Sequence, residues 1–324
     1  MVSVATFNLN NLFSRFNFRA EVDAAPSDAE GGITLTFGAG SIDVRTFLGR
    51  LVREKSEADT NAIASRIRDV MDADVLAVQE VEHIEILKQF NRDDLGGLYP
   101  HVALIEGNDP RMIDVGVLSK LPIGAITSHQ TATHADDPDQ RVFGRDLLEV
   151  EILDASGRKL FKLYNTHLKS HFVPFGEDPV AGAAKANARR RRQAETIARL
   201  IGQRERADAK FVLVGDMNDP PDSQHIAPML TIDGRPLTNG LENAVETRPA
   251  KAESTGQGAG PQSPVWTHRF NPPGADTPPE YELYDHIWLS SGLAPALQSA
   301  HIDRRTKHGG DGSDHDPAWV VLDL

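Results

Sequence analysis

Residues 211–219 of this chain read Phe-Val-Leu-Val-Gly-Asp-Met-Asn-Asp. The first four are apolar and two of them are β-branched, which is typical of a short buried strand. A glycine then ends the run, and Asp216, Asn218 and Asp219 offer side-chain oxygens just beyond it. The same residue types also form ordinary turns. The stretch therefore predicts a strand with polar groups at its tip, and a chemical role for them depends on matching groups elsewhere.

The bulk composition limits the class of protein. A chain of 324 residues that is 40% hydrophobic can bury a sizeable core, as one large domain or two smaller ones. The net charge of −13 argues against a broad basic surface, although a local patch or a bound cation could still attract phosphate. The chain has no cysteine, which excludes disulfides, thiolate metal sites and cysteine nucleophiles. A metal site would therefore use oxygen and imidazole ligands.

The sequence carries no sign of a membrane segment. Its first residues lack a charged region followed by a long apolar one, and no apolar run approaches the length of a membrane span. We expect a soluble chain, cytoplasmic as given. A mature secreted protein stays open as an alternative, because a removed leader would leave no trace.

The pattern of an apolar strand next to polar groups recurs along the chain. Five candidate groups follow a predicted strand and three precede one; the former are Asn8, Glu80, His167, Asp216 and Asn218, and the latter are Asp285, Asp314 and His315. In a sheet with antiparallel pairs, the end of one strand and the start of its neighbour lie on the same edge. One rim of the fold could therefore hold all eight groups.

Helical periodicity separates some of these strands. Apolar residues recur at helical spacing in 60–71, 84–90 and 181–204, which suggests sheets covered by helices. The arginines at 189–192 are expected to form a solvated helix face, with phosphate contact as the alternative. No internal repeat is present. We expect one domain over 1–324, with irregular insertions near 19–59 and 220–279.

In chain order, the motifs resemble those of the endonuclease/exonuclease/phosphatase superfamily, which includes pancreatic-type DNases, exonuclease III-like repair enzymes and neutral sphingomyelinases. The matching segments are 6–10, 79–80, 165–170, 215–218, 285–287 and 313–317. The resemblance implies a DNase I-like fold, a four-layer α/β/β/α sandwich with two packed, mostly antiparallel sheets. It also implies a divalent metal at one rim, Mg²⁺ or Mn²⁺, with Ca²⁺ also possible.

The resemblance further implies which residues hold the metal. Glu80 is the candidate for the principal ligand, since Mg²⁺ prefers carboxylate oxygen; a helix N-terminal glutamate is the alternative. Further candidates are Asn8, Asp216, Asn218 and Asp314. Repair-enzyme relatives often carry a carboxylate two positions after Asn8, where this chain has the neutral Asn10. Whether one ion or two operates stays open.

The remaining expected roles concern proton transfer and phosphate binding. Asp216 would align and deprotonate the attacking water, and Asn218 would orient it. His315 with Asp285 resembles the family's imidazole and carboxylate pair. His167 matches a position assigned to leaving-group protonation or phosphate binding, with Tyr164 as a competing candidate. Phosphate oxygens would be bound by Asn8, His167 and Arg145, with Arg111 as a second arginine.

These roles predict a divalent-metal-dependent phosphodiester hydrolase, above all a DNase-like nuclease that attacks phosphorus in line with water. Its expected partner is a phosphodiester substrate, above all nucleic acid, with no obligate protein partner. One alternative is a phosphatase or a lipid phosphodiesterase of the inositol phosphate or sphingomyelin type, which the apolar Phe172, Val173 and Phe175 would suit. A catalytically inactive binding module is disfavoured, because the carboxylate and imidazole groups are all retained.

Overall fold

The computed structural model describes residues 1–13, 55–173, 176–248, 265–270, 280–304 and 312–324. It also gives the backbone of two short strand pairs, β2 (Ile33–Phe37) with β3 (Gly40–Val44) and β4 (Thr46–Phe47) with β5 (Arg50–Leu51). Much of each predicted insertion, and Phe175, lie outside the described residues.

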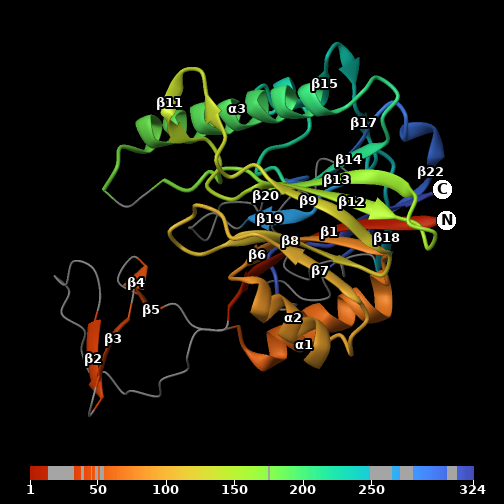
Figure 1. Cartoon of the computed structure of the whole chain (residues 1–324). Helices are drawn as coiled ribbons and strands as arrows, with labels where there is room; N and C mark the ends of the chain where they lie inside the picture. The colour runs from red at the N-terminus through yellow and green to blue at the C-terminus, as the bar shows by residue number, and fades with distance from the viewer. Residues whose placement is uncertain are drawn as a thin grey trace, which may run out of the picture.

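Two large sheets form the centre of the molecule (Figure 1). The first has the order β18-β22-β23-β1-β6-β8-β7, built from β1 (Val2–Leu12), β6 (Val75–Val81), β7 (His101–Leu104), β8 (Asp114–Ser119), β18 (Val245–Arg248), β22 (Leu297–Asp303) and β23 (Ala318–Leu322). The second has the order β17-β21-β14-β13-β12-β9, built from β9 (Ile123–Ser128), β12 (Leu147–Leu153), β13 (Lys159–His167), β14 (Phe211–Asp216), β17 (Thr238–Asn239) and β21 (Asp285–Leu289). Most neighbouring strands are antiparallel; the parallel pairs are β1–β6, β13–β14 and β18–β22.

Helices cover the outer faces of both sheets. In Figure 1, α1 (Glu57–Ser65) and α2 (Ile84–Asp93) lie below the first sheet, and α3 (Pro179–Arg204) lies above the second. Three apolar clusters fill the three spaces between these four layers: one between the sheets, one under α1 and α2, and one under α3. The predicted α/β/β/α sandwich is thereby confirmed.

The helices begin at recognisable caps. The side chain of Ser56 accepts a hydrogen bond from Asp59 N at the start of α1, and Asp178 caps α3 ahead of Pro179 in the same way. The predicted helix over 60–71 is a true α-helix only in its first part. From Arg66 the chain continues as a π-helix, η1 (Arg66–Met71).

Gly215 does not end its strand, contrary to the sequence-based expectation. β14 runs through it to Asp216, paired on both sides. The backbone of Gly215 has a φ of +134°, and a methyl group there would lie 1.9 Å from Thr166 O. Glycine is needed because no other residue combines this conformation with so close an approach.

Several short elements escaped prediction because they lack a clear apolar period. The stretch after Pro220 holds η2 (Ala227–Leu230), β15 (Thr231–Ile232) and β16 (Arg235–Pro236), and buries Met229 and Ile232 under α3. Strands β9 and β22 were also not predicted. The strand β19 (His268–Phe270) lies in a run, 265–270, that the sequence does mark as strand-like, whereas the small elements β10 (Thr133–His134), β11 (Asp137–Arg141), β20 (Glu280–Glu282) and η3 (Ala294–Ala296) were not predicted.

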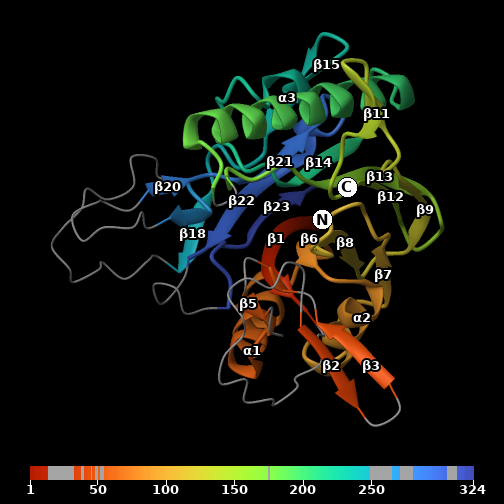
Figure 2. The same cartoon turned by 90° about the vertical axis from the view of Figure 1, so that its left-hand side faces the viewer.

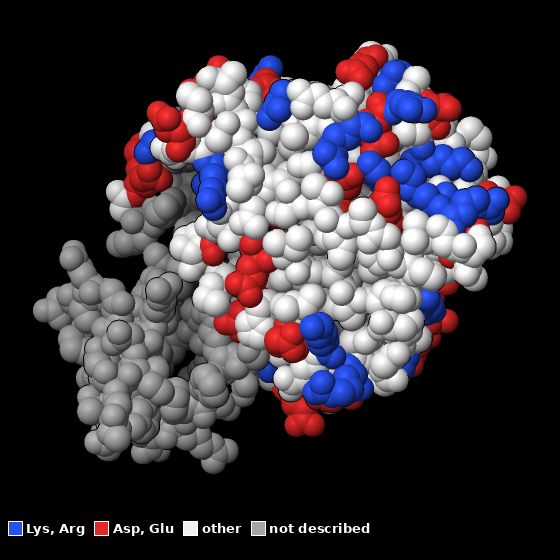
Figure 3. Space-filling view, in the orientation of Figure 1, with Lys and Arg blue, Asp and Glu red and all other residues white. Residues whose placement is uncertain are grey.

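The charges on the surface and the hydropathy of the described helices both agree with the amino-acid composition. On the face seen in Figure 3, Lys and Arg are interspersed with Asp and Glu, and the densest basic group lies to the right, the side on which both termini lie in Figure 1. Within the described ranges, no helix combines the length and the apolar character that crossing a bilayer requires.

Candidate active site

Two of the three parallel strand pairs, β1–β6 and β13–β14, deliver polar side chains to one edge of the sandwich. In Figure 1, β1 runs from the N-terminus at the right toward the left, so Figure 2, seen from the left, faces its carboxyl end. β6 runs parallel to β1, and in the facing sheet β13 runs parallel to β14. The carboxyl ends of parallel strands share an edge, so Asn8 and Glu80 meet at the rim of one sheet and His167 and Asp216 at that of the other.

Irregular backbone at the rim aims two of these side chains. Pairing between β1 and β6 shifts register after Asn8, and pairing between β6 and β8 shifts around Glu80, which has a φ of +61°. An extra residue of this kind bends a strand and re-aims a side chain, and such bulges are common beside active sites. The adjacent bulges turn both side chains toward the rim.

Three neighbouring strands place a row of polar groups in register. His167 on β13 pairs with Asp216 on β14, which pairs with Asp285 on β21. His167 Nε2 lies 3.4 Å from Asp216 Oδ2. From the loop before β23, His315 joins the row, with Nδ1 2.6 Å from Asp285 Oδ2 and Nε2 3.8 Å from Asp216 Oδ2. Four predicted site residues are therefore buried side by side.

Asn8 connects the first sheet to this row. Its Nδ2 donates to Asp216 Oδ2 at 2.9 Å, and its Oδ1 accepts from Asn10 N at 2.9 Å. These two partners determine the orientation of the amide, because Asp216 accepts and Asn10 N–H donates. The Asn10 side chain itself turns away and accepts from Asn11.

A buried polar bridge sets the spacing of the two sheets just beneath the rim. Asn165 Nδ2 on β13 donates to Val78 O and Gly116 O of the first sheet, at 3.0 and 2.8 Å. Gln79 Nε2 donates to Asn165 Oδ1 at 2.9 Å. Since buried amides left without partners are costly, this bridge holds the two halves of the site in one relative position.

The carboxylates determine the charge of His315. Burial lowers the pKa of this imidazole, but Asp285 and Asp216 outweigh it and raise the pKa well above the usual range. His167 has the opposite character: burial, reinforced by Arg145, lowers its pKa well below the usual range. At neutral pH the site therefore contains one cationic and one neutral imidazole.

Asp216 has the character of a base near neutrality. Burial raises its pKa to about 7; His315 opposes this shift, and Asp285 adds to it. Its Oδ1 accepts from Asn218 N at 2.9 Å, while Asn218 Nδ2 donates to Leu168 O at 3.2 Å. Asn218 thereby stands beside the carboxylate in a left-handed conformation, with a φ of +51°.

Glu80 and Asp314 stand at the outer side of the row. Burial raises the pKa of Glu80, with Asp314 adding to it and His315, Arg145 and Arg111 opposing it, so all four charges lie within electrostatic reach. Asp314 is the more open of the two carboxylates, with a side chain 52% exposed. The two groups bring negative charge to the mouth of the site.

Arg145 reaches the site from the start of β12. It is 4% exposed; Nη2 donates to Leu168 O at 3.0 Å, Nη1 lies 3.2 Å from Asp109 Oδ2, and Nε has no partner among the described residues. Arg111 shares the same carboxylate, with Nη2 3.0 Å from Asp109 Oδ2. Both predicted arginines thus lie near the row, held by an aspartate that was not singled out from the sequence.

Tyr164 does not compete with His167. Its hydroxyl donates to Glu205 Oε1 at 2.5 Å, and its ring packs in the cluster under α3. Tyr164 lies three residues before His167 on β13, so their side chains leave opposite faces of the sheet. The structure therefore places Tyr164 away from the row that contains His167.

A sequence model described as the endonuclease/exonuclease/phosphatase family matches residues 5–315. The chain belongs to the endonuclease/exonuclease/phosphatase family. Members of this family are hydrolases that act on phosphoester bonds. The match encloses every group of the rim described above, from Asn8 to His315.

Solved structures share the fold of this family member. An AP endonuclease from Archaeoglobus fulgidus superposes with a TM-score of 0.57 at 14% identity, and a mannosyl-6-phosphatase from Bacteroides thetaiotaomicron with 0.51 at 16%. A 3′ phosphatase from Neisseria, bound to a product DNA hairpin, superposes with 0.53 at 13%. Each comparison covers 100% of both chains. A search of curated protein sequences returned no match.

The donor set of this family member fits a divalent cation. Asp216, Asp285 and His315 offer ligand atoms within 4.8 Å of one another, and the buried Asp285 Oδ1 has no hydrogen-bond partner. Carboxylate oxygens suit both Mg²⁺ and Mn²⁺, whereas the cationic His315 could act as a ligand only after losing its proton. Two buried carboxylates repel each other, and a bound cation would relieve that repulsion.

His268 is a further neighbour of the site that the sequence did not reveal. It offers a ligand atom within 4.8 Å of those of Asp314 and His315, and its ring lies 4.8 Å from that of His315 between centroids. Its backbone forms an isolated antiparallel bridge with His315. The only sequence signal was a short strand-like run, which carries no information about its contacts.

Proposed function

We propose that this protein is a Mg²⁺- or Mn²⁺-dependent phosphodiester hydrolase that acts on nucleic acid. The observation that carries the proposal is the buried row of His167, Asp216, Asp285 and His315, completed by Asn8 from the facing sheet. In-line hydrolysis requires a base for water, positive charge for the non-bridging oxygens and a donor for the leaving oxygen.

Each requirement has a candidate residue. Asp216, with its pKa raised to about 7, suits the base that accepts a proton from water at neutral pH. His315, kept cationic by Asp285, and Arg145, with a free Nε, suit the binding of phosphate oxygens. His167 is neutral and can donate one N–H to the phosphate or to the leaving oxygen.

Carboxylates at the rim would hold the divalent cation. Glu80 and Asp314 stand at the mouth of the site, while Asp216 and Asp285 belong to the buried row. When bound, the ion would withdraw charge from the phosphate oxygens and lower the barrier to attack. Asn218 would orient the water or the phosphate beside Asp216.

The direct test is cleavage of plasmid DNA and of a single-stranded oligonucleotide in Mg²⁺ or Mn²⁺, with and without chelator. We expect cleavage that the chelator abolishes and that Asp216→Asn reduces at least about a hundredfold. Asp139→Asn, which removes an exposed carboxylate on β11, serves as the matched control. Absence of chelator-sensitive cleavage between pH 6 and pH 9 would overturn the nuclease assignment.

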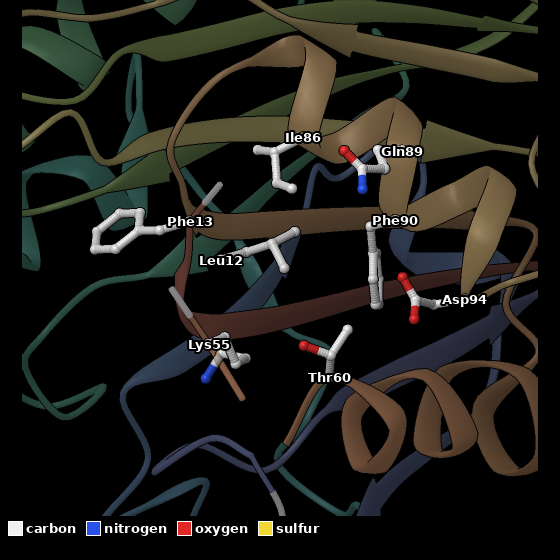
Figure 4. Close-up of a pocket in the computed structure, with 8 residues that line it drawn as sticks. All are labelled: Leu12, Phe13, Lys55, Thr60, Ile86, Gln89, Phe90 and Asp94. Atoms are coloured by element: carbon white, nitrogen blue, oxygen red, sulfur yellow. The ribbon is translucent and has the colours of Figure 1, made fainter. Parts of the chain in front are cut away.

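A lipid phosphodiesterase is the second candidate, and one exposed apolar side chain near the site favours it. Phe172, four residues after Leu168, is 44% exposed. A cavity of about 220 Å³ at the end of β1, between α1 and α2, adds nothing to this candidate, because its wall also contains the polar residues Lys55, Thr60, Gln89 and Asp94 (Figure 4). Val173 is less available, since it packs against Gly182 of α3. A substrate panel of DNA, RNA, an aryl phosphodiester, sphingomyelin and a phosphomonoester separates the candidates.

A further inference from the structure

Four cationic side chains gather beside the catalytic row, on the side of α3. We call Arg111, Arg145, Lys169 and Arg189 the cation cluster. Arg111 and Arg145 both bind Asp109, at 3.0 and 3.2 Å. A methyl group at Gly144 would lie 3.4 Å from Arg189 Nη2 and 3.9 Å from Asp109 Oδ2, so Arg189 reaches the same place from α3.

Lys169 completes the cluster next to the site. Its backbone follows Leu168, whose carbonyl accepts from both Arg145 and Asn218. Its ammonium group donates to Ser170 O and Phe172 O, at 2.8 and 2.9 Å, and binds no carboxylate of a described residue. Burial, reinforced by the nearby arginines, lowers the pKa of Lys169 to about 8. The cation cluster thus lies directly beside the row that would hold the scissile phosphate.

Within the described part of the chain, Lys169 and Arg189 have no carboxylate partner, whereas Arg111 and Arg145 share Asp109 and also lie within electrostatic reach of Glu80. Asp109 serves both Arg111 and Arg145, and Arg189 is half-buried without a hydrogen bond or ion pair to any described residue. The other arginines of the 189–192 run differ. Arg190 is fully buried, with Nε 2.8 Å from Asp219 Oδ2. Arg191 forms an ion pair with Glu195, with Nε 2.9 Å from Oε1. The run is therefore not the uniformly solvated face expected from the sequence.

Like charges held together in a partly buried place cost free energy unless an anion joins them. In a chain of net charge −13, such a local excess is a departure from the overall balance. We infer that the cation cluster binds a second phosphate of the substrate, adjacent to the one that is hydrolysed. The preferred substrate is then a polynucleotide strand, which carries a phosphate at every step, and not a diester with a single phosphorus.

This inference rests on the proposed function, and two substrates separate them. Bis(p-nitrophenyl) phosphate carries one phosphorus, and a fluorescent single-stranded DNA 12-mer carries many. For Arg189→Gln we expect the ratio of kcat/KM on the 12-mer to that on the small diester to fall about five- to tenfold. The slope of log(kcat/KM) for the 12-mer against log[salt] should become shallower by about 0.7 to 1.

Two further variants control for charge and for folding. Arg191→Gln removes the same charge from the exposed side of α3 and should leave ratio and slope as in the wild type. Arg189→Lys keeps the charge and should restore the salt slope that Arg189→Gln loses. An Arg189→Gln variant with wild-type ratio and slope overturns the inference, as does an equal loss from Arg191→Gln.

A binding measurement keeps the test independent of turnover. If the wild type hydrolyses neither substrate, the proposed function fails, and fluorescence anisotropy of the 12-mer in chelator still reports on the cluster. Binding that Arg189→Gln weakens and Arg191→Gln does not supports the inference. Equal binding by all three proteins overturns it.

Discussion

Single residues at the rim adopt backbone conformations that most side chains avoid. Asn10, Glu80 and Asn218 have φ values of 48°, 61° and 51°, and Gly215 has a φ of +134°. Non-glycine residues in this region cost free energy and cluster at functional sites. At the rim, each of them lies next to a group that the proposed chemistry uses. The strain therefore coincides with the site.

The Gly215→Ala variant tests the cost of this backbone strain at the position where an added methyl group has the least space. The methyl group would meet Thr166 O at 1.9 Å in a conformation unfavourable to alanine, so we expect the free energy of unfolding to fall by about 2–4 kcal/mol. Urea denaturation followed by circular dichroism measures it. Gly157→Ala is the matched control, because Gly157 has a φ of +83° but open space around it, and should lose only about 1–2 kcal/mol. Equal losses in both variants would contradict the argument.

Asp285→Asn tests how His315 acquires its charge. The amide keeps the shape of the side chain but removes the carboxylate 2.6 Å from Nδ1, so the raised pKa of His315 should drop toward its usual range. The imidazole then loses its proton at a lower pH than in the wild type. NMR titration of the metal-free protein measures this shift, and kcat should fall at least about a hundredfold. A titration of His315 like that of the wild type would refute the pairing; Asp323→Asn, at an exposed position, is the control.

At the scale of elements, buried ion pairs connect helices to the strands that carry the site. Arg66, at the start of η1, binds Asp303 on β22 at 2.9 Å and Asp316 at 2.8 Å, and Asp316 directly follows His315. All three side chains are buried. Removing one partner of such a group leaves an uncompensated charge, which is strongly destabilising. The π-helix thereby holds the loop that presents His315.

A second network joins the C-terminal end of α3 to the second sheet and predicts a pH dependence. Glu149 on β12 binds Lys162 at 2.8 Å, Arg204 at 2.6 Å and His129 at 3.1 Å. Burial opposes its ionisation, but these three hydrogen bonds prevail and lower the pKa of Glu149 to about 2. A depressed carboxyl pKa contributes stability above the unfolded-state value, and that stability is lost as pH falls toward the folded-state value.

Comparison of the wild type with Glu149→Gln isolates this contribution. We expect the variant to be less stable at pH 7 by on the order of 2–3 kcal/mol, and the difference to shrink by more than half between pH 5 and pH 3. Urea denaturation at each pH measures it. Glu151→Gln on the same strand, whose partner Lys159 is exposed, should show little effect at either pH. A difference that stays constant with pH would contradict the assignment.

At the scale of the whole molecule, the two sheets bring four carboxylates to one rim of an already acidic protein. Glu80, Asp216, Asp285 and Asp314 come from different elements, and their proximity opposes folding unless a cation joins them. A divalent ion that binds the folded state should therefore stabilise it by mass action.

We expect millimolar Mg²⁺ or Mn²⁺ to raise Tm by several degrees relative to chelator, since occupancy at 100 times Kd is worth about 2.7 kcal/mol. Glu80→Gln should reduce this rise, while Asp139→Asn on exposed β11 should preserve it. Differential scanning calorimetry provides the measurement without any substrate. A Tm that neither ion changes would speak against a metal at this rim.

Prediction from sequence succeeded where strong local patterns exist. The strands β6, β14 and β21 and the helices α2 and α3 follow from apolar runs, apolar periodicity and the polar residues beside them. It failed where pattern is weak, as for β9, β22 and the elements after Pro220, whose places depend on packing under α3. His268 and Asp109 escaped notice for the same reason, because a single polar residue in a short run carries no local signal of its contacts.

The sequence by itself determined the family and the strand ends that carry Asn8, Glu80, His167 and Asp216, because an apolar run followed by a polar group is a local pattern. The tertiary structure alone decided what these groups become. Register across β13, β14 and β21 sets His167, Asp216 and Asp285 side by side, and the burial that follows makes one imidazole neutral and the other cationic. It also gave the arginines of α3 different environments: Arg190 is buried in an ion pair, Arg191 is exposed, and Arg189 faces the site. These environments depend on neighbours that lie far away in the chain.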